Sequence, residues 1–192
     1  MLPDLVDAGH PALHLLNTAG GPTKERTVER LSTWADVLDF ALAVGFVDAA
    51  ESAALQVESA AADAALADLR AQREALHGFL VAAVAGTEPA RGDRERVTRD
   101  IRAAHRAATL SARLDGPAWT VDVAVGPALI GHRFALATAA LLTGPQRSQI
   151  AGCGRCSWFF LDPSPSRRRR WCSMATCGNR AKAARHHGRR SS

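Results

Sequence analysis

The chain has 192 residues, 47% of them hydrophobic, which suits one domain of ordinary size, or one such domain and a small appended module. The first residues lack the basic start of a secretory signal, and no apolar run approaches the roughly 20 residues that span a bilayer. These features argue against a secreted or membrane protein, and we expect a soluble, cytoplasmic one.

The net charge of +5 hides an asymmetry along the chain. Residues 1–145 carry 13 basic and 18 acidic side chains, whereas residues 146–192 carry 11 basic side chains and one acidic side chain, Asp162. Like charges at that density need solvent or a polyanion around them. Arg outnumbers Lys by 22 to 2 and Ala is very common, so a GC-rich coding bias is a second source of arginine. We therefore divide the chain into a body, residues 1–145, and a basic module, residues 146–192.

The first predicted element is a short apolar segment that ends in a turn. Gly20, Gly21 and Pro22 break any helix after Asn17 and Thr18. These two polar side chains either cap the turn or line a small-molecule pocket in the body. The cap is favoured because Asn and Thr hydrogen-bond readily to nearby backbone groups.

Residues 32–45 predict a core-packed helix. Thr33 and Asp36 stand at capping-box spacing at its start, and Gly45 ends it. One face of this helix is apolar and consists of Trp34, Val37, Leu38, Ala41 and Leu42.

Residues 48–86 predict two further helices, with a break near Asp63. Asp48 and Glu51 form a second capping pair at the start, and Gly86 ends the segment. The apolar residues fall mostly at helical spacings: Leu55, Leu66, Leu69, Leu76, Phe79, Leu80 and Val84.

The rest of the body alternates helix and hairpin. Residues 91–114 are polar and then helical, with a thin apolar stripe that suits a surface helix or a mobile connection. Residues 110–125 alternate apolar and polar around an Asp-Gly-Pro turn and predict a small β-hairpin. Residues 128–144 predict a helix that is apolar almost all round and therefore lies at the centre. The body is thus predicted to be mainly α with one small β-hairpin.

All four cysteines lie in the basic module at the spacing C-x2-C-x15-C-x4-C. They are Cys153, Cys156, Cys172 and Cys177. Two close pairs about 15 residues apart are typical of a tetrahedral zinc site. Another thiolate-bound metal or cluster stays open, whereas disulfides are disfavoured in a reducing compartment and a lone C-x2-C redox site leaves the second pair unexplained. Four thiolates leave no position for a catalytic water, so we expect one structural Zn2+. The chain has no phosphate-cradling Gly loop, nucleophile elbow or H-E-x-x-H motif, so we expect no enzyme.

The residues between the cysteines predict a treble-clef-like finger with a short hairpin and a helix. "SWFFLD" is β-prone, "PSPS" is a turn, and "RRRRWC" is predicted to return as the second strand. The segment after Cys172 is rich in helix formers, and Cys177 is placed near the start of that helix. The aromatic residues of this segment either stack bases or cover the metal, and the cover is favoured because so small a module has little other core.

The module resembles a known family. "CGRCSWFFLDPSPSRRRRWCSMATCGNRAKAARHH" is similar to the CGNR zinc finger, whose members share a phenylalanine-rich strand ending in Asp, then Arg-Trp-Cys-Ser-Met and Cys-Gly-Asn-Arg-x-Lys. In that family the finger follows a helical ABATE domain, and "HLLNTAGG", "LSTW" and "LRAQREALHGFLVAAVAG" resemble that domain. The resemblance implies a zinc-binding, DNA-binding bacterial transcription regulator of the stress response, with the four cysteines as zinc ligands.

Two groups of basic residues are candidates for nucleic-acid contact. The first, Arg167, Arg168, Arg169 and Arg170, is predicted at the tip or on the returning strand of the hairpin. Alternate side chains of a strand point to opposite faces, so two would contact phosphate and two would support the module. The second group lies near one side of the predicted helix and consists of Arg180, Lys182 and Arg185. For this group phosphate contact is favoured over a solvated face.

These observations predict a two-part regulator. The body senses a small-molecule effector, forms a homodimer, or both, and the finger binds nucleic acid, DNA before RNA. Because phosphates would supply most of the affinity, binding should weaken steeply with salt. The alternative is a zinc-stabilised RNA-associated or protein-interaction module that docks on an acidic partner.

Overall fold

A computed structural model describes residues 8–56, 59–114 and 116–190, and it is mainly α. The helices are α1 (Pro11–Leu16), α2 (Trp34–Ala43), α3 (Ala49–Ala54), α4 (Ala60–Ala85), α5 (Arg91–Ala107), α6 (Ala128–Thr143) and α7 (Asn179–Arg190). The antiparallel ribbons are β1 (Ala19–Gly20) with β2 (Val28–Glu29), β3 (Ala108–Arg113) with β4 (Gly116–Val121), and β5 (Ile150–Gly152) with β6 (Phe159–Leu161). Short turns are η2 (Val123–Val125), η3 (Pro145–Gln149) and η4 (Met174–Gly178). Within the described ranges, no helix has both the length and the apolar character needed to cross a membrane.

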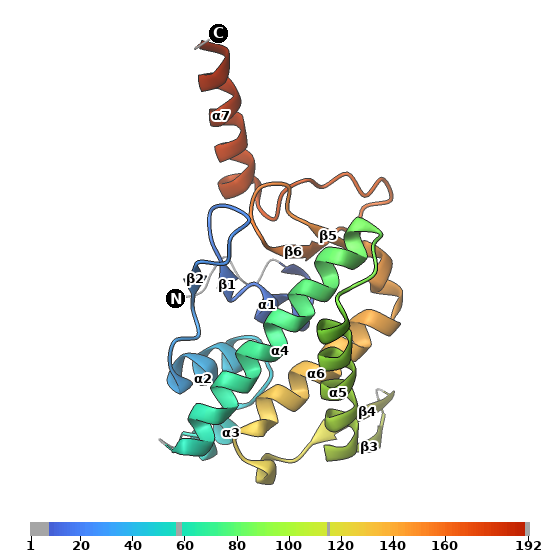
Figure 1. Ribbon diagram of the computed structural model, residues 1–192. Helices are drawn as coiled ribbons and strands as arrows, with labels where there is room; N and C mark the ends of the chain where they lie inside the picture. The colour runs from blue at the N-terminus through green and yellow to red at the C-terminus, as the bar shows by residue number, and fades with distance from the viewer. Residues whose placement is uncertain (1–7, 57–58, 115, 191–192) are drawn as a thin grey trace.

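Helix α6 lies at the centre of the body, as its apolar surface predicts. It packs against α1, α4 and α5, and the long helix α4 crosses the molecule beside it (Figure 1). Leu129, Ile130 and Leu141 of α6 are fully buried. The β3–β4 hairpin lies at one end of the body, and the β5–β6 hairpin and α7 lie at the other (Figure 1).

Both predicted capping boxes form. The hydroxyl of Thr33 accepts a hydrogen bond from Asp36 N, and the carboxylate of Asp48 accepts one from Glu51 N. The break between α3 and α4 comes earlier than the predicted position near Asp63. The hydroxyl of Ser59 accepts a hydrogen bond from the backbone N–H of Ala62 and so starts α4.

The predicted apolar face of α2 is wrong at one position, where Phe40 is buried in place of Leu42. Phe40 is fully buried, whereas Leu42 is 44% exposed. The buried face is centred on Val37 and Ala41, and Leu42 is turned by about 100° from Ala41 around the helix. In α4, Val84 in the last turn is likewise exposed, although Leu80 one turn earlier is buried.

The surface helix and the small hairpin are both confirmed. Val97 and Ala104 of α5 are buried, and the polar side of the helix faces solvent. Strand β3 begins at Ala108 directly after the helix, so the helix ends earlier than the segment 91–114 predicts. In the hairpin, Leu110 stands opposite Trp119.

The finger has a hairpin and a helix, but the predicted partner strand is wrong. Strand β6 pairs with β5, which precedes the first cysteine, and the arginine run forms a loop instead of a returning strand. Asp162 causes this: its carboxylate accepts hydrogen bonds from Ser164 N at 3.1 Å and from Arg169 N at 2.9 Å, which folds the chain into a turn. Pro163 and Pro165 lack the N–H groups that a strand there would need.

Candidate metal centre

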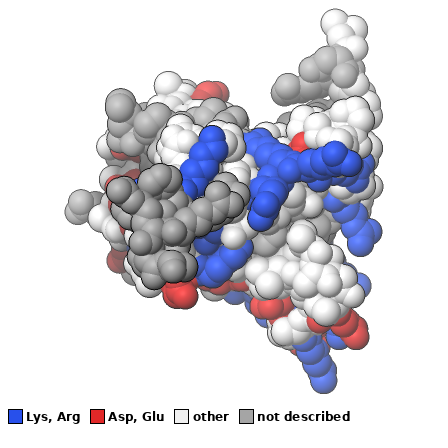
Figure 2. All heavy atoms as spheres, turned by 90° about the horizontal axis from the view of Figure 1, so that it is seen from above, with Lys and Arg blue, Asp and Glu red and all other residues white. Residues whose placement is uncertain are grey.

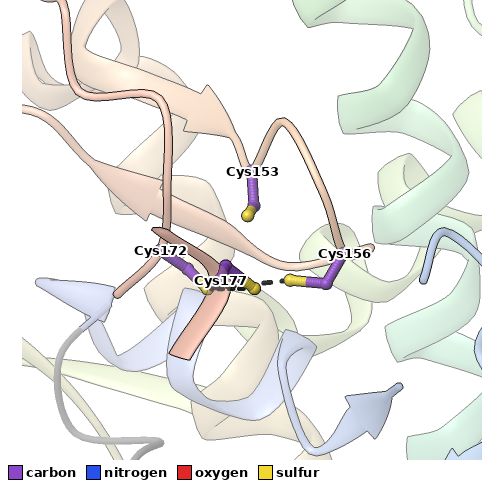
Figure 3. Close-up of side chains that lie close together, drawn as sticks. All are labelled: Cys153, Cys156, Cys172 and Cys177. Carbon is purple, nitrogen blue, oxygen red and sulfur yellow. Dashed lines mark hydrogen bonds between the residues drawn. The ribbon is translucent and has the colours of Figure 1, made fainter. Parts of the chain in front are cut away.

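The four cysteine side chains converge on one point (Figure 3). Their Sγ atoms all lie within 4.8 Å of one another, with Cys156 to Cys172 at 3.6 Å and Cys172 to Cys177 at 3.7 Å. A tetrahedral zinc ion with Zn–S bonds of about 2.3 Å requires sulfur atoms about 3.8 Å apart. The donor set and its spacing therefore fit one structural zinc ion.

The four ligands come from three local structures. Cys153 follows β5 and Cys156 precedes β6, so that the first pair forms the turn of this hairpin. Cys172 follows the arginine loop, and Cys177 lies in η4, a single π-helical turn that leads into α7. All four are buried, and they pack with Phe160, Trp158 and Trp171. This packing supports the prediction that the aromatics cover the metal.

The thiols of Cys153, Cys156 and Cys172 are too close to ionise independently. Hydrogen bonding to Cys156 lowers the pKa of Cys153. Hydrogen bonding to Cys153 raises the pKa of Cys156 to about 12 and also raises the pKa of Cys172. A divalent cation supplies the positive charge that allows all four thiols to ionise, so metal binding releases protons.

Cationic side chains lie around this centre. Lys24 Nζ donates a hydrogen bond to the carbonyl oxygen of Cys153, and Arg169 Nη2 donates one to the carbonyl oxygen of Cys172. The guanidinium of Arg169 also lies over the ring of Phe160, with its Cζ 4.3 Å from the ring centroid. Zinc with four thiolates keeps a net charge of about −2, which these cations offset.

Comparison with known families agrees with this geometry. The model described as "CGNR zinc finger" matches residues 149–190, and the ABATE model, described as "Putative stress-induced transcription regulator", matches residues 9–145, more than half of the chain. The chain belongs to the ABATE family. It carries a CGNR zinc finger at its C-terminal end, in which the four cysteines hold one structural zinc. No curated protein matches the chain.

The arginines of the CGNR finger loop divide into two kinds. Arg167 donates to the carbonyl oxygen and the hydroxyl of Ser148, and Arg169 donates to the carbonyls of Trp171 and Cys172. Both side chains therefore hold the loop in place. Arg168 and Arg170 are exposed, and the Arg170 guanidinium lies 5.2 Å from the centroid of the Trp171 ring. Two of the four arginines thus hold the loop through hydrogen bonds, although Arg167 is itself exposed and the loop is not a strand.

The basic residues of α7 are only partly within the described part of the chain. Arg180 and Lys182 are exposed on the first turn of this helix, whereas the side chain of Arg185 lies outside the described residues. Asn179 donates to the carbonyl oxygen of Ala175 at 3.2 Å and so binds a backbone group. A Cβ on Gly178 would lie 2.7 Å from Met174 Sδ, so a side chain there would require the exposed Met174 side chain to move.

The feature that sequence reasoning missed is the docking of the finger on the ABATE domain. Strand β6 has side chains on two faces: Phe159 and Leu161 belong to the core of the body, and Phe160 belongs to the zinc cluster. The finger is therefore packed onto the body through its own hairpin. The signal for this docking was the uninterrupted apolar run in "SWFFLD", since a strand buried on both faces is apolar at every position.

Asn17 lies in this contact, and the side chain of Thr18 beside it bonds within the body. Asn17 is 2% exposed; its Nδ2 donates to the carbonyl oxygen of Phe159 at 2.8 Å, and its Oδ1 accepts from Phe159 N at 3.1 Å. Thr18 Oγ1 donates to the carbonyl oxygen of Leu15 at 2.7 Å and accepts from Arg73 Nη1 at 2.9 Å. Both side chains thus have hydrogen-bond partners within the protein, and Asn17 joins the body to the finger.

Two further contacts complete the docking. A Cβ on Gly20 would lie only 2.3 Å from Trp158 Nε1, so the absence of a side chain in β1 lets the indole approach. On α4, His77 Nε2 donates to the carbonyl oxygen of Ser157 at 3.1 Å, and its ring meets that of Phe159 edge-on with 5.5 Å between centroids.

The docking should depend on pH through His77. Burial and the nearby charge of Arg26 hold the pKa of His77 below its ordinary value of 6.5, and these outweigh the Ser157 carbonyl, Glu74 and Asp93, which act in the opposite direction. The unfolded chain therefore takes up the proton first as the pH falls, so the stability from neutral His77 is complete above about pH 6.5 and is lost below it.

We expect the free energy of unfolding to fall more steeply for wild type than for His77→Gln between pH 7 and about pH 5.5. Glutamine can still donate to the Ser157 carbonyl, but it does not titrate. Urea unfolding across this range measures the difference. Parallel pH profiles for the two proteins would show that His77 carries no pH-dependent stability.

Proposed function

We propose that this protein is a cytoplasmic transcription regulator that binds duplex DNA through its CGNR finger. The family descriptions support a zinc-binding regulator. A binding role is also supported by the metal centre, because four thiolates fill a tetrahedral zinc and leave no position for a reacting water. In this proposal the ABATE domain senses a small-molecule effector or forms a homodimer.

Helix α7 is the first element that favours DNA. It begins on η4 and then projects away from the body (Figure 1). Its 12 residues span about 18 Å, and an α-helix of ordinary width fits the major groove of B-form DNA. The major groove of A-form RNA is too narrow for such a helix. A projecting basic helix therefore favours duplex DNA over duplex RNA.

The observation that carries the proposal is a basic groove beside α7. Its lining consists of Arg168, Arg169, Arg170, Trp171, Ser173 and Met174. Figure 2 looks down on this end of the molecule and shows Lys and Arg side chains across the face, with Asp and Glu mostly at its margins. Arg168 and Arg170 are exposed here, and their guanidinium groups match the geometry of phosphate oxygens.

This surface is held in shape before any ligand arrives. The zinc ion fixes the arginine loop against η4, and Asn17 and His77 fix the hairpin against the ABATE domain. A rigid surface loses less conformational entropy on binding than a flexible basic tail does. The fixed positions of the basic side chains therefore support the proposal that the finger binds phosphate groups through a preorganised surface.

Replacing the two exposed loop arginines should weaken DNA binding. For Arg168→Gln/Arg170→Gln we expect an affinity loss of about tenfold, and the slope of log affinity against log salt should become shallower by about 1.8, since each lost phosphate contact removes about 0.9. Fluorescence polarisation with a labelled duplex over a salt series measures both quantities.

Arg167→Gln is the matched control, because that guanidinium is bonded to Ser148 and should contribute little to the slope. Unlabelled RNA duplex of the same sequence serves as competitor and should compete more weakly than DNA. The proposal fails if wild type shows no salt-dependent DNA binding. Stronger competition by RNA would instead support the RNA-associated module.

A further inference from the structure

A second basic face lies on α5, far from the finger in the sequence and within the otherwise acidic ABATE domain. A shallow surface groove follows this helix, and five arginines line it. The charged residues of the groove are Arg91, Arg94, Glu95, Arg99, Arg102 and Arg106. Positions 91, 95, 102 and 106 follow one another at multiples of a helical turn, so they form one continuous stripe. The net charge of the body therefore conceals a strongly cationic helix face.

Three of the five arginines pair with an acid, each through an exposed guanidinium. Arg94 pairs with Glu88, and Arg99 Nε lies 3.8 Å from Asp100 Oδ1. Arg91 pairs with Glu95 at 2.6 Å, but the two side chains are 84% and 61% exposed, and such surface pairs contribute little. Arg102 and Arg106 make no ion pair or hydrogen bond with any described residue. Arg96, on the other side of α5, shows the contrast: it is held by Asp68 at 2.5 Å and Asp100 at 2.6 Å and is 18% exposed.

We propose that the α5 face, defined by Arg91, Arg94, Arg99, Arg102 and Arg106, is a second binding surface for the phosphate backbone of nucleic acid. The proposal rests on the proposed function, since it assumes that the finger binds the same polyanion. It adds a sequence-independent contact on the ABATE domain, and so a longer footprint than the finger alone would give.

The composition of the groove favours nucleic acid over a protein partner. Its lining contains no apolar side chain, whereas protein interfaces need an apolar centre and membrane-binding helices need an apolar face. The apolar residues of α5 that could fill such a role, Val97 and Ala104, are buried against the body. A phosphodiester backbone requires only cations at suitable spacing.

The length of the α5 face also fits a nucleic-acid backbone. From Arg91 to Arg106 the helix rises about 22 Å. Duplex DNA carries one negative charge per about 1.7 Å of its axis, so several phosphates can lie along the stripe at once. Binding through several exposed cations should appear as a steep salt dependence.

The test is a salt series of DNA affinity for the full-length protein with a duplex long enough to reach beyond the finger. Arg99→Gln/Arg102→Gln/Arg106→Gln should make the slope of log affinity against log salt shallower by about 2.7, at about 0.9 per contact. The corresponding triple lysine variant keeps the charge and should keep the slope. Glu95→Gln removes the acid of the groove and should bind more tightly than wild type.

The outcomes separate this inference from the proposed function. If wild type binds DNA and the finger double variant changes the slope, but the α5 glutamine variant does not, the second surface is wrong and the finger remains the site. If wild type binds no DNA, the proposed function itself fails. If the α5 glutamine variant keeps its DNA affinity but loses binding to phosphatidylglycerol vesicles, the face is a membrane contact and the inference is overturned.

Discussion

Removing zinc should abolish high-affinity DNA binding and unfold the finger, while the helices of the ABATE domain stay folded. Apart from the cysteines, the cluster around the metal contains one buried aromatic, Phe160, and half-buried Trp158, Trp171 and Ala151. So small a core cannot offset the entropy of ordering the finger, so the metal must supply most of its stability. The body has its own core around α6, which contains no zinc ligand, so its helices should stay folded.

We expect the loss of DNA affinity on chelation to be on the order of a hundredfold, because the loop arginines and α7 lose their fixed arrangement. Cys172→Ser should reproduce the effect, and Ser173→Ala at the neighbouring position should not. Metal content, circular dichroism and fluorescence polarisation with labelled DNA measure the three consequences. Unchanged affinity in the metal-free protein would mean that the basic residues act as a charged peptide without need of the fold.

Local features of this protein could be predicted from sequence because their causes lie within a few residues. The zinc shell follows from the spacing of two cysteine pairs, and the capping boxes at Thr33 and Asp48 need only a partner three residues later. The central position of α6 follows from its apolar surface. In each case the chemistry that decides the structure is visible in one short segment.

The partner of strand β6 was predicted wrongly because two segments flank it and both are close. On the N-terminal side only residues 153–158 connect β5 to β6, so a short hairpin forms there. On the C-terminal side, Pro163 and Pro165 remove backbone donors and Asp162 folds the chain into a turn. The prolines were a usable signal against a returning strand, and the arginine run outweighed it in the prediction.

The apolar run of β6 indicates a strand buried on both faces, but no local pattern identifies the residues that it docks against. The contact joins Asn17 to Phe159 across 142 positions of the chain, and a lone Asn before a glycine pair equally well predicts a turn. Arg169 shows the same limit, since its role in holding Cys172 depends on a loop whose path the sequence does not reveal. Long-range hydrogen bonds of single polar side chains become visible only in the fold.

Asn17→Ala should destabilise the protein far more than the same change at the other asparagine, Asn179. The Asn17 side chain satisfies both the N–H and the carbonyl of Phe159 inside the contact between body and finger. Leaving a buried polar group without a partner costs about 1–3 kcal/mol, so the loss of both bonds should cost roughly 2–5 kcal/mol. Asn179 is exposed and makes one bond to Ala175, so its removal should cost less than about 1 kcal/mol.

Asn17→Ala should weaken the contact between the finger and the body but leave the zinc site intact, which distinguishes it from metal loss. The zinc ligands do not include Asn17, so Asn17→Ala should still hold one ion per chain. Hydrogen exchange at the Phe159 amide should accelerate, because its acceptor is removed and the strand is no longer held against α1. Equal stability losses for Asn17→Ala and Asn179→Ala, or a Phe159 amide that stays protected, would show that packing of Phe159 and Leu161 holds the finger without the clamp. If both effects appear with zinc retained, Asn17 holds an already folded finger against the ABATE domain.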